Sequence, residues 1–179
     1  MNLPNKLTLL RVLVIPFFIV LLMTGHDYMA GILFIAASLT DMLDGYIARK
    51  YNLITNFGKI MDPLADKLLV TSALICLVEL NRVAGWMVIV ILAREFIITG
   101  LRSVAAGEGR IIAAGKSGKL KTVLQMVALA VILLKDWPFS IFTDLPIGLS
   151  LLWLAVAVTV YSGVEYIVQN RDVFRKKES

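Results

Sequence analysis

The sequence predicts an all-α integral membrane protein, a bundle of six transmembrane helices. The 179-residue chain is 59% hydrophobic with a mean hydropathy of +0.82, whereas soluble domains are about 45–50% apolar. Its apolar residues fall into six long runs, and a spanning helix needs about 20 such residues. Lys and Arg are concentrated on one side of these runs, as in membrane proteins of fixed orientation.

The six apolar runs give the expected spans, which are Leu7–Met23, Tyr28–Ala48, Lys59–Leu80, Trp86–Arg102, Lys119–Leu134 and Pro146–Val168. These spans leave too little chain for a separate soluble domain, so residues 1–179 are predicted to form a single membrane domain. The segment Asn2–Leu10 is expected to lie along the membrane surface before the chain turns inward.

The distribution of positive charge predicts the orientation. Six spans put both termini on one side of the membrane. Arg82 and Lys135 lie in loops on the opposite side and Arg94 lies within a span, while every other Lys and Arg falls on the side of the termini. By the positive-inside rule, both termini are cytoplasmic. No basic, aromatic soluble module is present, which argues against a nucleic-acid partner.

Four carboxylates in the second and third spans need an explanation, because ionisable residues within spans are costly. Asp41 and Asp44 are three residues apart and Asp62 and Asp66 four apart, so each pair shares one face of its helix. Ionised together they would repel one another unless positive charge lies between them. Two divalent cations held by carboxylate oxygens would supply it. No His or Cys accompanies the cluster, which favours Mg²⁺ or Mn²⁺.

A depth estimate places this cluster near the cytoplasmic edge of the membrane. At about 1.5 Å per residue, Asp41 and Asp44 lie about 20–24 Å from the outer end of their span. Arg11, Arg102 and Lys121 come out at about the same depth on their own helices. A site in this layer can take a lipid from the side and a water-soluble molecule from the cytosol.

The acidic segment resembles a known family. All fixed positions of the CDP-alcohol phosphatidyltransferase signature are matched by Asp41, Asp44, Gly45, Ala48, Arg49, Gly58, Asp62 and Asp66. The resemblance implies that the four aspartates ligate two metal ions. It also implies that Asp44, Gly45, Ala48 and Arg49 hold the cytidine nucleotide of a CDP-lipid. Gly58 opens the third span, where free backbone N–H groups favour an anion such as the CDP-lipid phosphates, although helix packing explains this glycine about as well. Asp66 is then the general base, and a homodimer is expected.

Other segments are similar to bacterial phosphatidylglycerophosphate synthases, namely Asn2–Arg11, Arg94–Glu95, Arg102 and Lys116–Thr122. That resemblance implies CDP-diacylglycerol and sn-glycerol 3-phosphate as substrates, in a bacterial plasma membrane with the site at its cytoplasmic face. A phosphate-bearing acceptor needs cationic and hydroxyl donors, and those expected are Thr8, Arg11, Arg102, Lys116 and Lys121. For the two lysines, snorkelling to the membrane edge is an equally good explanation.

Arg94, Glu95 and Glu165 are charged residues within spans that no motif assigns. Arg94 and Glu95 are adjacent, so they are expected to point to different sides of their helix. An interhelical ion pair explains them as well as ligand binding does. Glu165 is a candidate partner for a cation, but no spacing rule selects one.

Three alternatives remain open. A sibling transferase would use inositol phosphate, serine or phosphatidylglycerol as acceptor. A divalent-cation transporter would also place carboxylates within spans, although the acids lie at one edge and no inverted repeat is visible. An inactive scaffold of the same fold is disfavoured by the four intact aspartates.

Overall fold

The computed structural model describes residues 3–50, 56–107, 109, 112 and 115–171. Over these ranges the backbone forms six α-helices and one short 3-10 helix, without strands. The elements are α1 (Leu3–Met23), α2 (Asp27–Lys50), α3 (Asn56–Glu79), α4 (Gly85–Gly107), α5 (Lys116–Leu133), η1 (Phe139–Ile141) and α6 (Ile147–Gln169). The predicted all-α class is confirmed for this part of the chain.

The helices extend beyond the apolar runs at the end of the bundle that carries the charges. α4 continues to Gly107 and α5 begins at Lys116, because polar and basic residues end an apolar run without ending a helix. α1 is continuous from Leu3. The segment expected to lie along the membrane surface is therefore, from Leu3 onward, the first part of the same helix.

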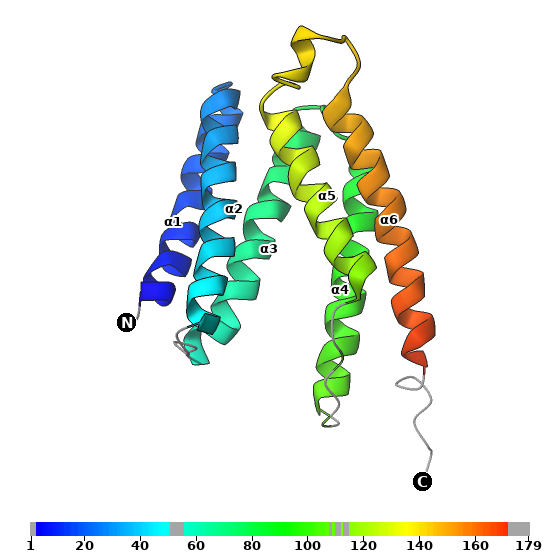
Figure 1. Ribbon diagram of the computed structural model, residues 1–179. Helices are drawn as coiled ribbons and strands as arrows, with labels where there is room; N and C mark the ends of the chain where they lie inside the picture. Colours follow the sequence, from blue (N-terminus) through cyan, green and yellow to red (C-terminus); the bar gives the residue numbers. More distant parts are fainter. Residues whose placement is uncertain (1–2, 51–55, 108, 110–111, 113–114, 172–179) are drawn as a thin grey trace.

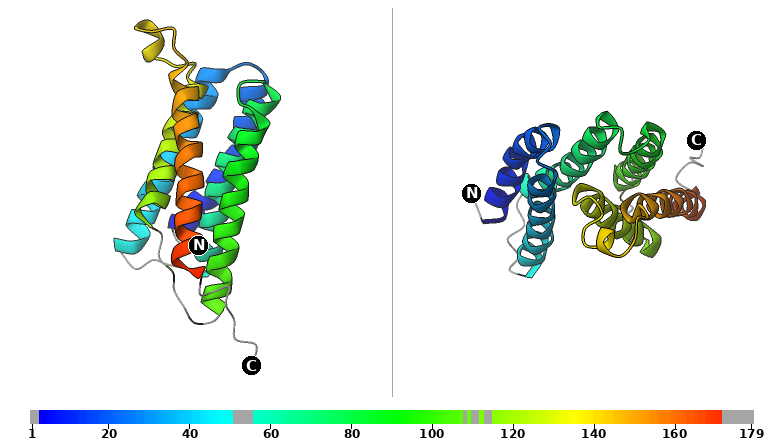
Figure 2. Two further views of the ribbon diagram at one scale, coloured as in Figure 1. Left: turned by 90° about the vertical axis from the view of Figure 1, so that its right-hand side faces the viewer. Right: turned by 90° about the horizontal axis from the view of Figure 1, so that it is seen from above.

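The six helices form two groups of three (Figures 1 and 2). In one group α1 packs against α2 and α3, and in the other α6 packs against α4 and α5. The groups meet where α2 contacts α5 and α3 contacts α4. The first turn of α1 and the last turn of α6 lie at the same end of the bundle (Figure 1). This end also holds the C-terminal ends of α2 and α4, and we call it the terminal end.

The main apolar core lies toward the opposite end of the bundle. It includes Phe18 of α1, Phe34 of α2 and Leu77 of α3, all essentially buried. The rings of Phe18 and Phe34 lie 6.0 Å apart. Near the terminal end there is a smaller cluster formed by Ile98, Leu101 and Tyr166. Apolar contacts therefore hold the helices together most strongly away from the termini.

Large apolar side chains also cover the outside of the bundle, as in Phe17 of α1, Ile89 of α4 and Val160 of α6. By length and hydropathy, one helix of the described residues is able to cross a membrane, α6, and the apolar part of α1 from Leu7 is shorter. α4 carries Arg94, Glu95 and Arg102 within its length, and these charges lower its hydropathy. The six predicted spans thus correspond to six helices, while their insertion in a membrane stays a prediction.

A buried carboxylate ties together the end of the bundle away from the termini. Asp27, at the start of α2, has a side chain that is only 2% exposed. It accepts a hydrogen bond from Arg82 Nη1 at 2.6 Å, and Lys135 Nζ lies 2.7 Å from its other oxygen. Burial alone would raise the pKa of Asp27, but the hydrogen bonds and charges of Arg82 and Lys135 together lower it below 3.8. The start of α2 is thereby joined to the loops that follow α3 and α5.

We expect Asp27→Ala to lower the free energy of unfolding by about 1–3 kcal/mol, because it removes a buried acceptor shared by two cations. The measurement is thermal unfolding of the purified protein in detergent. Asp144→Ala, which removes an exposed carboxylate near the start of α6, is the matched control and should leave the transition unchanged. Because the pKa of Asp27 is lowered in the folded state, its contribution is full above pH 3.8 and is lost as pH falls through the lowered value. Equal transitions for the two variants at neutral pH would contradict this role.

Candidate active site

The four motif aspartates lie on two helices that follow each other along the chain. Asp41 and Asp44 belong to the C-terminal half of α2, and Asp62 and Asp66 to the N-terminal half of α3. These halves lie at the terminal end of the bundle (Figure 1). Asp41 is the one motif residue whose side chain is described. For the other motif positions the structure gives the helix, and their side chains lie outside the described part: Asp44, Gly45, Ala48, Arg49, Gly58, Asp62 and Asp66.

Among the described residues, no three His, Cys, Asp or Glu side chains come together as a metal site would require. The side chains of three of the four predicted ligands lie outside the described part of the chain, so this finding does not bear on the predicted centre. The chemistry of the donor set does fit hard divalent cations, because all four motif side chains are carboxylates and such cations prefer oxygen ligands.

An arginine from α1 meets the first motif aspartate. Arg11 Nη1 lies 2.5 Å from Asp41 Oδ1, and the two side chains are 2% and 35% exposed. Thr8, one turn earlier in α1, is also buried. Positive charge expected near the carboxylates is therefore supplied in part by α1, and the partly exposed Asp41 remains accessible from one side.

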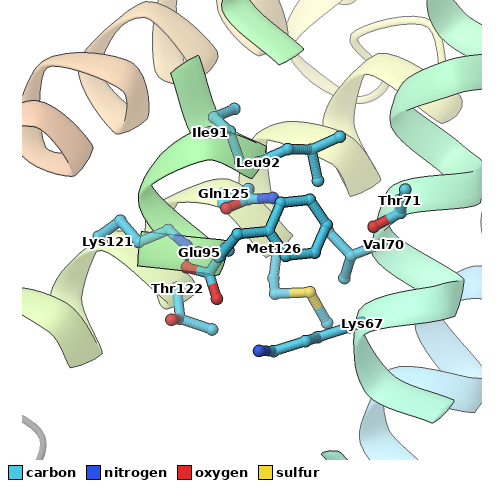
Figure 3. Close-up of a pocket in the computed structure, with 11 residues that line it drawn as sticks. Lys67, Val70, Thr71, Ile91, Leu92, Glu95, Lys121, Thr122, Gln125 and Met126 are labelled. Atoms are coloured by element: carbon cyan, nitrogen blue, oxygen red, sulfur yellow. Dashed lines mark hydrogen bonds and ion pairs between the residues drawn. The ribbon is translucent and has the colours of Figure 1, made fainter. Parts of the chain in front are cut away.

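A pocket lies next to this region, between α3, α4 and α5 (Figure 3). Lys67, Glu95, Lys121 and Gln125 are among its polar residues. Its apolar wall includes Val70, Ile91, Leu92, Phe96 and Met126. Lys121 Nζ donates a hydrogen bond to Glu95 Oε1, and Lys67 Nζ donates one to Thr99 Oγ1 at 2.6 Å. Because Lys67 directly follows Asp66 in α3, this pocket borders the acidic segment.

A second pocket lies between α4, α5 and α6. Arg94 and Arg102 of α4 line it together with Ser117, Glu165 and Tyr166. The Ser117 hydroxyl donates to Glu165 Oε2, and the Gln169 amide donates to Glu165 Oε1 at 3.4 Å. Glu165, expected as a candidate partner for a cation, thus accepts hydrogen bonds from a hydroxyl and an amide.

The Arg94 side chain passes close to two glycines on neighbouring helices. A Cβ at Gly163 would lie 3.1 Å from Arg94 Cγ, and a Cβ at Gly118 would lie 3.3 Å from Arg94 Nη2. Arg94 Nη1 lies 3.3 Å from Glu95 Oε1. The expectation that these adjacent residues point apart is therefore wrong, since the long arginine side chain reaches back to its neighbour. Within the described part of the chain, Arg94 Nε and the Tyr166 hydroxyl are buried without hydrogen-bond partners.

The predicted acceptor-binding residues lie in four places. Arg11 pairs with Asp41 and Thr8 lies one turn earlier in α1, while Lys121 lines the first pocket and Arg102 the second. Lys116 is exposed at the start of α5. Lys67, Ser117 and Gln125 also line these pockets and are not among the predicted residues, although the sequence contains two signals for them. Lys67 is a charge within a predicted span, and Gln125 lies one turn beyond Lys121 on the same helical face.

Comparison with known proteins identifies the family. A family model described as CDP-alcohol phosphatidyltransferase matches residues 1–161. The chain is 48% identical to a Bacillus subtilis protein, with 97% of both chains covered. It is 42% identical to one from Rickettsia typhi, covering 97% of this chain and 99% of the other. It is 37% identical to one from Shigella flexneri, with 93% of both covered. All three relatives are named CDP-diacylglycerol–glycerol-3-phosphate 3-phosphatidyltransferase. The chain belongs to the CDP-alcohol phosphatidyltransferase family.

Proposed function

We propose that this enzyme transfers the phosphatidyl group of CDP-diacylglycerol to sn-glycerol 3-phosphate, giving phosphatidylglycerophosphate and CMP. The observation that carries the proposal is similarity over nearly the full length to relatives named for this reaction, at up to 48% identity. The chain also retains every fixed position of the family motif between Asp41 and Asp66. The reaction belongs to phospholipid biosynthesis.

The motif aspartates are the proposed metal ligands. Family members generally depend on divalent cations, and the side chains expected to hold two Mg²⁺ or Mn²⁺ ions are Asp41, Asp44, Asp62 and Asp66. The pairing of Arg11 with Asp41 supports a site that needs compensating positive charge. Bound divalent cations would stabilise negative charge that develops on the phosphate oxygens during transfer.

The chain's own residues have three tasks in this reaction. Asp44, Gly45, Ala48, Arg49 and Gly58 hold the nucleotide of the CDP-lipid. Asp66 accepts the proton of the acceptor hydroxyl. The oxygen of that hydroxyl then forms a bond to the phosphorus that carries the diacylglycerol group, and the bond from this phosphorus to the CMP oxygen breaks. The residues that bind the acceptor phosphate are Thr8, Arg11, Arg102, Lys116 and Lys121.

The proposed setting is the plasma membrane, with residues 1–179 as one domain of six spans. Both termini and the site face the cytoplasm. The exposed apolar residues around the bundle support a lipid environment. The placement of the first turn of α1 and the last turn of α6 at one end (Figure 1) supports an even number of spans. On the basis of the family resemblance, we also propose that the enzyme forms a homodimer.

We expect the purified protein to release CMP from CDP-diacylglycerol and Mg²⁺ when sn-glycerol 3-phosphate is supplied. Inositol phosphate, serine and phosphatidylglycerol, each offered alone, are the controls and should give no release above background. Release of CMP with one of these acceptors instead would agree with the family assignment but contradict sn-glycerol 3-phosphate as the acceptor. No release with any acceptor would favour the transporter or the inactive scaffold.

We expect Asp66→Asn to lower kcat by about 10²–10⁴-fold, the usual contribution of a general base. The amide keeps the shape of the side chain but cannot accept the hydroxyl proton. Steady-state CMP release measures the loss, and thermal unfolding shows whether the variant is folded. Asp144→Asn, remote from the motif, is the control. A folded Asp66→Asn enzyme with wild-type kcat would exclude the assigned role.

We expect Arg102→Ala to raise the KM for sn-glycerol 3-phosphate about tenfold or more, because it removes a charge-assisted contact with the acceptor phosphate. The KM for CDP-diacylglycerol should change much less. Initial rates with each substrate varied in turn give both constants. A larger change for CDP-diacylglycerol would remove Arg102 from the acceptor site.

A further inference from the structure

Glu95 is a carboxylate in the middle of α4 with cations around it. Lys121 Nζ of α5 donates to Glu95 Oε1, and Arg94 Nη1 lies 3.3 Å from the same oxygen. The Lys121 side chain is 3% exposed and the Glu95 side chain 24%. A buried ammonium without a partner is strongly destabilising. Glu95 therefore supplies compensating negative charge to the buried ammonium of Lys121.

The Glu95–Lys121 pair stands between the two pockets. α4 and α5 each pack against α6 and make few contacts with each other, so the space between them is open to side chains. Glu95 lines both pockets, whereas Lys121 lines the pocket toward α3 and Arg94 the pocket toward α6. Figure 3 shows the Glu95 and Lys121 side chains meeting at the edge of the first pocket. One carboxylate thus fixes cations that belong to two neighbouring pockets.

A simple packing role accounts poorly for this arrangement. Well-packed apolar residues usually stabilise a helix interface as well as a buried ion pair does. Apolar side chains already line the same pocket, among them Val70, Ile91 and Met126. A lysine has a long flexible stem and binds phosphate as a point charge. Holding its ammonium at the border of a pocket needs a fixed carboxylate beside it, and Glu95 provides one.

We propose that Glu95 is a positioning residue that holds Lys121 at the pocket between α3, α4 and α5 and so sets the affinity for the phosphate of the acceptor. This inference rests on the proposed function, in which Lys121 binds that phosphate. Glu95 acts through Lys121 and does not itself contact the acceptor phosphate, which a carboxylate would repel.

The test measures KM for each substrate in the full-length enzyme. Glu95→Gln should raise the KM for sn-glycerol 3-phosphate about tenfold or more, the effect of losing one charge-assisted contact. The KM for CDP-diacylglycerol should stay within about twofold of the wild-type value. Glu95→Asp, which keeps the charge on a shorter side chain, should recover part of the loss. Glu79→Gln, an exposed carboxylate at the far end of α3, is the matched control and should have wild-type constants.

A double variant separates positioning from a structural role. If Glu95 acts through Lys121, adding Glu95→Gln to Lys121→Gln should not raise the acceptor KM beyond that of Lys121→Gln alone. Additive effects, or equal increases in both KM values, would overturn the proposal. If Glu95→Gln does not fold, wild-type constants in Glu95→Asp would overturn it, and a selective rise in the acceptor KM would support it.

The wild-type enzyme distinguishes this inference from the proposed function. Absence of CMP release with sn-glycerol 3-phosphate refutes the function. Normal release by the wild type, together with an unchanged acceptor KM in folded Glu95→Gln, refutes the role of Glu95 alone.

Discussion

Charged side chains that lie between helices need an oppositely charged partner. An unpaired buried charge destabilises the folded state by more free energy than most single apolar contacts contribute. In this bundle the partners come from different elements. Arg11 of α1 meets Asp41 of α2, and Lys121 of α5 meets Glu95 of α4. Asp27 joins the start of α2 to two loops. Each pair forms only when its two elements have a particular rotation about their axes and a particular position along the bundle. Apolar surfaces alone specify this arrangement less strictly.

The two ends of the bundle differ in packing and in the role of their charged residues. Away from the termini, the buried side chains of Phe18, Phe34 and Leu77 form a continuous apolar core, and the Asp27 cluster closes it. Toward the terminal end the apolar cluster is smaller, charged and polar residues lie between the helices, and two pockets open there. A site for a phosphorylated, water-soluble acceptor needs such polar space, and the tightly packed opposite end can hold the helices while the terminal end stays open.

Structural features that depend on a single helix can be predicted from the sequence. Apolar runs predict six helices, and fixed spacings predict the aspartate motif, since residues three or four apart share a face. Helix ends are less predictable, because basic residues such as Lys116 end a run without ending the helix. Partners across helices are not predictable from spacing, since they depend on how neighbouring helices are rotated. The pairing of Glu95 with Lys121, and of Ser117 with Glu165, is of this kind.

Arg94 gives this dependence between helices an evolutionary consequence. Its stem passes Gly163 on α6, and its guanidinium passes Gly118 on α5, at distances that leave little room for a methyl group. At Gly118 the neighbouring atom is at the end of a flexible side chain and can move aside, whereas at Gly163 it belongs to the stem. A larger residue at position 163 therefore becomes tolerable where position 94 carries a shorter side chain. Positions 94 and 163 are therefore expected to change together as lineages diverge, although they lie on two helices far apart in the sequence.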